Sequence, residues 1–438
     1  MNIRKICLLT SLAWTVMGAA LAQSSGCNSP YSRYGWGMLS DESQGFNKSL
    51  GSVALGFRGK DVLNRQNPAS YAAIDSMTFL FDVGVSLQYG HWSENGKSVN
   101  AHNSTLDYLE AGLRLFKNVG VSIGMRPISI VGYNFNTTQT LPDNDGYGEK
   151  TATSTFEGSG GVRQAWLGLG WQIFKPLSVG VNAGYIWGDY QHNSSLTYNE
   201  TNIQNLARMY KGSINTYSLD FGLQYETKFG KKDVVSIGAT FGLGHEMKGK
   251  STFINQKRSS SSVVGADTSY TFKSFELPTS YAAGITWRHA EQLTIGLDYV
   301  CQLWKDCKFP QLNENNNSMS YFTGTGVFRN KNKMALGVEY IPQPEGMRIT
   351  DHICYRVGAS YSTSYININQ HSGPKEYLVS VGIGLPLVNK YNTRSTLNVA
   401  LQWQRFSPST DQSIKEDYFK LCLGLSFNAN WFNKWKIE

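Results

Sequence analysis

The end of the chain alternates strictly between large apolar and small or polar side chains. Over residues 419–427 the large apolar positions are Phe419, Leu421, Leu423, Leu425 and Phe427. The positions between them are Lys420, Cys422, Gly424 and Ser426. Successive side chains of a β-strand point to opposite faces, so this segment has one apolar and one polar face. A strand with lipid on one side and water or packed protein on the other has this pattern, which predicts a membrane-spanning β-barrel.

About fourteen segments with this alternation cover most of the chain, each long enough for the roughly 9–11 residues of a tilted spanning strand. They lie at 79–89, 106–116, 119–133, 162–174, 177–189, 214–226, 233–246, 279–288, 292–304, 333–342, 353–363, 375–386, 395–405 and 417–428. No run after the N-terminus approaches the roughly 20 apolar residues of a spanning helix. Aromatic residues make up 13% of the chain, which suits the interfacial girdles of barrels. The sequence therefore predicts an all-β fold, a transmembrane antiparallel β-barrel of about 14 strands with an N-terminal plug segment.

The connections between these segments alternate in length. Short or moderate breaks lie near 117–118, 174–176, 229–231, 290–291, 342–352 and 387–394. Long polar stretches, interpreted as loops, lie at 92–105, 135–158, 190–212, 247–277, 305–331, 364–374 and 406–416. Outer-membrane barrels have long external loops and short periplasmic turns. We therefore predict location in the cell outer membrane with both termini periplasmic.

The first part of the chain does not follow the strand pattern. Residues 1–22 have a basic start, a short apolar run and the small-x-small sequence Ala20-Leu21-Ala22, which predicts a signal peptide. Cys27 lies soon after it, but the leucine usual before a lipidated cysteine is missing, so a free thiol or a crosslink is the alternative. Residues 23–76 are rich in glycine and polar residues and are predicted to form a plug or hatch segment, because a barrel of this size leaves a lumen to fill. Residues 77–438 are predicted to form the barrel.

Composition limits the classes of function. Charged residues make up only 16% of the chain, which is too few for a nucleic-acid binder despite a formal net charge of +8. No Cys/His spacing suggests zinc, and no nucleophile, base and acid are arranged as in covalent catalysis. We predict a protein that is not an enzyme and that has no metal or cofactor.

Several short motifs resemble the FadL family, whose members are outer-membrane transporters of long-chain fatty acids and other hydrophobic compounds. The motifs are Asn67-Pro68-Ala69-Ser70, Phe156–Gly161, Phe275–Pro278 followed by Ser280–Gly284, Tyr355–Gly358 and Gly382–Leu387. Two more, Ser29–Gly35 and Trp431–Lys434, resemble FadL-like proteins of Bacteroidetes-type bacteria. The resemblance runs over most of the chain after residue 22 and implies a barrel with an N-terminal plug. It also implies that Asn67, Pro68 and Ala69 line a ligand pocket, whereas a structural turn between plug and barrel is the alternative.

The inferred inward positions of the strands hold charges of both signs. They are Asp82, Glu110, Asp220, Asp298 and Glu339, with Arg114, Arg126 and Arg356. A transporter would use them to orient a carboxylate. The other reading is that they pair with one another and with plug residues such as Arg33, Arg58 and Arg65, because buried polar groups need partners.

Two functions follow as expectations. The first is passive uptake of hydrophobic compounds such as long-chain fatty acids, through the lumen after the plug shifts and through a side opening in the wall. The second is a non-transporting scaffold or shuttle subunit of a larger outer-membrane secretion or assembly complex, because FadL-like barrels of the same bacterial group also serve a secretion system. The expected partners are outer-membrane lipid, a hydrophobic small molecule or an outer-membrane protein complex, and no nucleic acid.

Overall fold

The computed structural model describes residues 27–76, 78–94, 96–141, 150–200, 203–259, 262–315, 318–368, 370–387, 395–408 and 414–430. The predicted signal peptide and the motif at 431–434 lie outside these residues. No helix in the described part of the chain is both long and apolar enough to cross a membrane.

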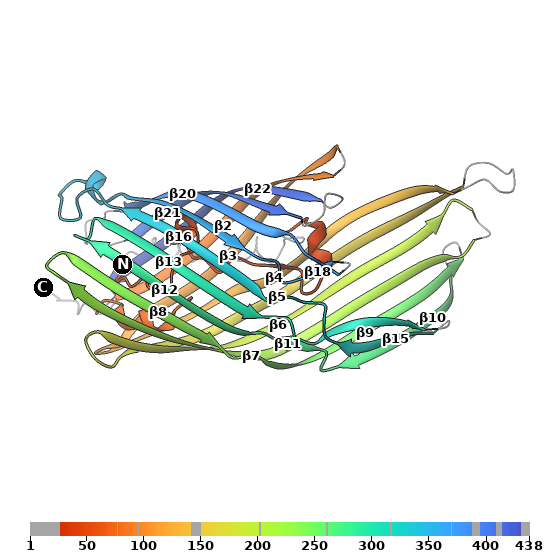
Figure 1. Cartoon of the computed structure of the whole chain (residues 1–438), viewed down its shortest axis with the longest axis horizontal. Coiled ribbons are helices and arrows are strands. Elements are labelled where there is room, and N and C mark those ends of the chain that lie inside the picture. Colours follow the sequence, from red (N-terminus) through yellow and green to blue (C-terminus); the bar gives the residue numbers. More distant parts are fainter. Residues whose placement is uncertain are drawn as a thin grey trace, which may run out of the picture.

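Fourteen antiparallel strands form one closed barrel (Figure 1), as predicted. The strands of the wall are, in order, β2 (Thr78–Glu94), β3 (Lys97–Phe116), β4 (Val119–Leu141), β5 (Lys150–Gln172), β6 (Leu177–Tyr198), β7 (Asn205–Phe229), β8 (Asp233–Gly242), β12 (Thr279–His289), β13 (Leu293–Leu303), β16 (Lys331–Tyr340), β17 (Cys354–Ser362), β20 (Lys375–Leu387), β21 (Ser395–Ser407) and β22 (Lys415–Asn430). The barrel closes where β22 pairs with β2, from Lys415↔Ser93 to Asn430↔Thr78.

The alternation seen in the sequence sorts the side chains between the two faces of the wall. On β22 the outward Phe419 is 55% exposed, whereas the inward Cys422 is 3% exposed. The outward Leu401 and Val381 on neighbouring strands are also more than half exposed. A large apolar surface of this kind needs a cover of similar chemistry, and lipid supplies it in a spanning barrel.

The short connections gather at one end of the barrel, which we call the turn rim, and the other end is the loop rim. Six strands reach far beyond the wall at the loop rim, in the long arm of Figure 1. They are β4, β5, β6, β7, β9 (His245–Ser259) and β10 (Ser262–Phe272). The β9 strand pairs with the loop-rim half of β7, and β10 pairs with β9. We call this arm the extended sheet. Much of the sequence interpreted as loops at 135–158, 190–212 and 247–277 is therefore paired strand, so that part of the prediction was wrong.

Shorter elements complete the loop rim and the turn rim. They are β11 (Phe275–Leu277), the hairpin of β14 (Phe309–Asn315) and β15 (Ser318–Gly324), the pair β18 (Asn367–Ile368) and β19 (His371–Ser372), and the 3-10 helix η4 (Ile349–His352).

Residues 27–76 lie inside the barrel and contain β1 (Met38–Leu39) and the 3-10 helices η1 (Pro30–Arg33), η2 (Lys48–Leu50) and η3 (Pro68–Ala73). We call them the N-terminal segment, and Figure 1 shows it in red and orange among the strands. The η2 helix packs against β16, β17, β20 and β21, and η3 packs against β3 to β7.

The N-terminal segment crosses the lumen from one rim to the other. Near its start, the Ser29 hydroxyl donates to Glu416 (2.7 Å to Oε1), at the loop-rim end of β22. Near its end, Tyr71 lies against Gly120 and Gly170, which are close to the short turns. Cys27 and the end of β22 therefore lie at opposite rims. Residues 1–26 and 431–438 lie outside the described part of the chain, so the placement of both termini in the periplasm stays a prediction.

Candidate functional site

The lumen is the candidate site, because it holds most of the buried charges. Two of the three short helices in the lumen, η1 and η3, begin at residues that commonly cap helices. Ser29 and Asn67 are N-caps whose side chains accept hydrogen bonds from the Tyr31 and Ala69 amides, and a proline follows each cap. These caps satisfy amides that a buried helix start leaves unpaired.

Asn67, Pro68 and Ala69 are completely or almost completely buried at the start of η3. The Asn67 side chain donates to the carbonyls of Leu55 (2.9 Å) and Leu223 (3.1 Å), which ties two parts of the N-terminal segment to β7. Gly222 leaves room for this side chain, because a Cβ there would overlap the side-chain oxygen Oδ1 of Asn67. The contacts are those of a structural turn, and ligand binding by these three residues stays a prediction.

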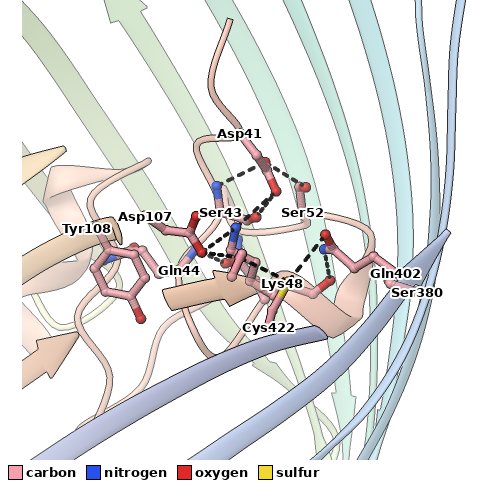
Figure 2. Close-up of polar contacts among 12 residues, drawn as sticks. Asp41, Ser43, Gln44, Lys48, Ser52, Asp107, Tyr108, Ser380, Gln402 and Cys422 are labelled. Atoms are coloured by element: carbon pink, nitrogen blue, oxygen red, sulfur yellow. Dashed lines mark hydrogen bonds and ion pairs between the residues drawn. The ribbon is translucent and has the colours of Figure 1, made fainter. Parts of the chain in front are cut away.

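Lys48 is the centre of the largest ion-pair group, shown in Figure 2. Its Nζ lies 3.1 Å from Asp107 of β3 and 3.7 Å from Asp41, and its side chain is 5% exposed. Lys333 of β16 approaches Asp41 from the other side at 3.9 Å. Burial alone raises the pKa of the Asp41 carboxyl, but Lys48 and Lys333 outweigh burial and hold that pKa well below its usual range. Lys48 thus bridges the N-terminal segment and the wall.

Hydrogen bonds fix the backbone around Lys48. The Gln402 side chain donates to the Lys48 carbonyl at 2.7 Å, and the Gly51 amide donates to the Ser380 hydroxyl at 3.0 Å. Ser43 and Ser52 both donate to Asp41 (Figure 2). The residues of η2 are therefore attached to β20 and β21 by their main chain as well as to β3 by their charge.

A second ion-pair group joins two of the predicted lumen charges. Arg126 of β4 pairs with Glu42 at 3.2 Å, and Arg65 pairs with Asp220 of β7 at 3.5 Å. The guanidinium groups of Arg126 and Arg65 both donate to the side-chain oxygen of Gln164, at 3.2 and 2.8 Å. Each ion pair of this group thus joins a charge on the N-terminal segment to an opposite charge on the wall.

Two more predicted charges on the wall receive hydrogen bonds from the N-terminal segment. Asp298 of β13 accepts the amides of Ala54 (2.6 Å) and Leu55 (2.9 Å). Glu110 of β3 accepts the Ser122 hydroxyl (2.6 Å) and the Gln44 amide group.

The remaining predicted charges are held within the wall. Asp82 accepts the Tyr108 hydroxyl at 2.8 Å. Glu339 pairs with Arg356 at 2.6 Å, and Arg356 also donates to Asn398 at 2.6 Å. Arg114 lies apart from these groups, because its guanidinium reaches the Phe116 carbonyl and Asn118 at the turn rim.

The sequence interpretation missed Lys48, Asp41 and Asp107. Side chains alternate between the two faces of β3, and with Glu110 inward the alternation predicts that Asp107 faces outward. However, the register between β2 and β3 shifts between Gly84↔Tyr108 and Val85↔Leu106. This bulge leaves Asp107 unpaired with β2 and lets its carboxylate reach Lys48. Lys48 and Asp41 lie outside any periodic segment, so no pattern marks them.

The space left in the lumen is a cavity of about 280 Å³ whose lining is rich in charge. The charged residues that line it include Asp41, Glu42, Lys48, Arg65, Arg126, Asp220, Asp298, Lys331, Lys333, Glu376 and Lys420. Pockets for small hydrophobic ligands are mostly apolar and range from roughly 300 to 1,000 Å³. This cavity lies at the lower end of that range, and its lining holds many more charged side chains than such pockets do.

The wall is split between β3 and β4 on the loop-rim side. These strands pair only from Leu109↔Met125 to Phe116↔Val119, after which β3 follows β2 and β4 follows β5. The N-terminal segment occupies the edge of the split, since Met38 and Leu39 of β1 pair with Ile130 and Ser129 of β4.

An aromatic cluster covers the N-terminal segment toward the loop rim. Trp36 is completely buried and contacts Trp304 edge-on, with ring centroids 5.4 Å apart. Trp304 in turn contacts Phe328 and Tyr365, and the Tyr365 hydroxyl accepts the Trp36 amide at 3.2 Å. The connections of the loop rim thus pack onto the N-terminal segment and close this side of the lumen.

The same fold occurs in solved structures of outer-membrane channels. The CymD monoaromatic hydrocarbon channel is 13% identical with a TM-score of 0.57, and the alignment covers 90% of this chain and 99% of that one. The P. putida toluene transporter TodX is also 13% identical (TM-score 0.57, 91% and 100% covered). A Pseudomonas aeruginosa FadL homologue is 10% identical (TM-score 0.57, 90% and 99% covered). At these identities the likeness establishes a FadL-like barrel fold.

Sequence comparisons give a family. A family model described as BamG matches residues 2–438. Among curated proteins, no sequence matches this chain.

Proposed function

The chain belongs to the BamG family, and we propose that it is a closed outer-membrane β-barrel that serves as a non-transporting scaffold subunit of a larger outer-membrane complex. The observation that carries this proposal is the filled lumen. Residues 27–76 make buried ion pairs with Asp107 on one side of the wall and Asp220 on another. In this role the segment acts as a plug that stays in place.

Energetics favour a fixed plug over a moving one. Removing one partner of a buried ion pair costs about 3–5 kcal/mol. Moving the N-terminal segment would separate the pairs of Lys48 and Arg65 and release the Asp298 carboxylate from two amides. A small hydrophobic molecule would meet apolar side chains such as Trp36 and Ile186 in this cavity but would leave its charged side chains without water or a partner, which disfavours entry.

The extended sheet supplies the surface that a scaffold needs. The paired residues of β4 and β5 continue to Leu141↔Lys150, far beyond the roughly 9–11 residues that a spanning strand requires. Its strands present polar side chains on both faces near the tip, where Thr138 and Thr153 lie opposite each other. Paired strands hold their shape outside the membrane, so a partner protein would meet a preformed surface.

The decisive experiment is purification of the tagged protein from native membranes in mild detergent. We expect outer-membrane proteins in fixed stoichiometry, absent from an unrelated barrel that carries the same tag. A variant for comparison has a two-residue turn in place of residues 136–155, of which 136–141 pair with 150–155 across the β4–β5 hairpin. It should fold, as judged by heat-modifiable gel mobility, and lose the partners. A monomer that carries co-purified hydrophobic compounds would overturn the proposal.

Passive uptake of hydrophobic compounds is the second candidate, and the split between β3 and β4 favours it. The N-terminal segment covers the free edge of β4 there, through the pairing of Met38 and Leu39 and the hydrogen bond from the Ser40 amide to the Ile128 carbonyl (2.8 Å), so moving this part of the segment would connect the wall to the lumen. The related fold of monoaromatic hydrocarbon and toluene channels supports the same candidate. Uptake of labelled toluene and of a long-chain fatty acid into proteoliposomes, relative to protein-free liposomes, tests it and distinguishes aromatic from acyl substrates.

A further inference from the structure

Three lysines face outward on β7 and β9, directly beyond the apolar band of the wall. On β7 the outward residues Tyr217, Phe221 and Tyr225 are all exposed, and Lys211 follows on the same face toward the loop rim. On β9, which pairs with this part of β7, the outward exposed residues include Lys248 and Lys250. Aromatic side chains mark the level of lipid headgroups in spanning proteins, and Tyr217 is the outward aromatic of β7 nearest the loop rim, so these three ammonium groups lie from that level toward the loop rim.

The register places the three lysines close together. Lys211 pairs with Thr252, Lys250 with Ser213 and Lys248 with Asn215. Residues two apart on one strand, and diagonal neighbours on paired strands, are about 7 Å from each other. A single phosphate group is therefore within reach of two of these long, flexible side chains.

In the described part of the chain, no carboxylate forms an ion pair with these lysines. The next outward residue of β9, Glu246, is engaged by Lys308 at 2.7 Å and Lys273 at 3.7 Å. Asp189 lies on the same face opposite Ser213 of β7, so it is a diagonal neighbour of Lys211 but is separated from Lys248 and Lys250 by β7. Lys250 instead lies over the ring of Tyr270 at 4.4 Å, which holds its charge against the sheet.

We propose that Lys211, Lys248 and Lys250 form a binding site for the phosphate of a phosphorylated outer-leaflet lipid. Like charges on adjacent strands destabilise a sheet, and an anionic headgroup at the same depth removes that repulsion. Lysine binds phosphate as a compact charge with three donors, and the ring of Tyr270 supplies an apolar surface beside it. The site rests on the proposed placement in the outer membrane but needs neither a partner protein nor transport.

Native mass spectrometry of the detergent-solubilised full-length protein tests this site, with bis-phosphorylated lipid A as the probe. The variant Lys211→Gln/Lys248→Gln/Lys250→Gln should bind lipid A at least about tenfold more weakly than the wild type. The control Lys228→Gln/Lys231→Gln/Lys232→Gln makes the same change in charge at the turn rim and should bind as the wild type does. Dephosphorylated lipid A should bind the wild type and the lysine variant equally weakly.

Each of the following outcomes would overturn the proposal. Equal binding by the lysine variant, or equal loss in the control, would show that the three lysines are not the site. Retention of dephosphorylated lipid A by the wild type would assign recognition to the acyl chains. Displacement of lipid A by a small excess of inorganic phosphate would assign the lysines to a soluble anion. Recovery of partners in the native purification is a separate readout, so failure of the scaffold role and failure of this site are distinguishable.

Discussion

The Nζ atom of Lys48 lies 3.1 Å from the carboxylate of Asp107, across the boundary between the N-terminal segment and the barrel wall. Asp107 reaches this position only because it is the bulged residue between β2 and β3. A local irregularity of one strand pair thus provides the anion that fixes η2 in the lumen.

The Lys48–Asp107 pair predicts a strong coupling between two substitutions. Lys48→Met leaves the buried carboxylates of Asp41 and Asp107 without their shared cation, and should lower the free energy of unfolding by about 3 kcal/mol. The double variant Lys48→Met/Asp107→Asn should lose less than the sum of the two single variants. Urea titration followed by heat-modifiable gel mobility measures this, and strict additivity would refute the pairing.

Locking the N-terminal segment separates the two candidate functions. A Cβ on Gly337 would lie 3.0 Å from the Leu50 Cβ and 2.5 Å from the Leu50 carbonyl oxygen, so Leu50→Cys/Gly337→Cys should crosslink once the main chain at residue 50 moves slightly away from β16. A scaffold keeps its partners when this variant is oxidised, whereas uptake that requires plug movement stops and resumes on reduction. The single variants Leu50→Cys and Gly337→Cys, which cannot form this bond, are the controls.

Acid should loosen the N-terminal segment through Asp41. Its pKa in the folded protein is lowered, so the stabilisation is fully present above the unfolded pKa of about 3.9 and is lost as the pH falls below it. Limited proteolysis of the segment should therefore accelerate below about pH 4. Asp41→Asn should be more susceptible already at neutral pH and depend less on acid, while Asp267→Asn on the exposed strand β10 should behave as the wild type.

Gly238 of β8 packs against the main chain of the N-terminal segment, so a substitution there tests this packing. A Cβ there would lie 1.8 Å from the Leu55 carbonyl oxygen, so Gly238→Ala must displace main chain. We expect a loss of about 1–3 kcal/mol in the free energy of unfolding, the usual range for overpacking. Gly265→Ala on β10 meets no atom within 4 Å and should leave the stability unchanged. Equal stability of both variants would contradict the packing of Leu55 against β8.

The spanning parts of the strands could be predicted because lipid imposes alternation on them. The segment predicted at 375–386 corresponds to Lys375–Leu387, for example. The extended sheet could not be predicted in this way. Residues such as Asn136 and Thr138 face no lipid, so no alternation of hydropathy marks them, and their strand structure depends on pairing with β5.

The lumen was predictable in its chemistry but not in its partners. The alternation indicated that Arg126, Asp220 and Asp298 point inward. The alternative reading named Arg65 among their partners, and Arg65 does pair with Asp220, but nothing in the sequence indicated that Glu42 and the amide of Ala54 would meet them. These partners belong to a segment without periodic structure, whose path is set by the shape of the wall around it. The alternation of side chains therefore predicts the barrel wall, whereas the contacts of the N-terminal segment in the lumen can be identified only from the three-dimensional structure.

The passage of residues 27–76 from the loop rim to the turn rim limits the order of assembly. The segment is attached to β3 and β7 on one side and to β20 and β21 on the other. The β2–β22 seam is the last to form if strands add in chain order, and its completion encloses a segment synthesised before any of them. Residues 27–76 thus become an internal template around which the strands of the barrel close.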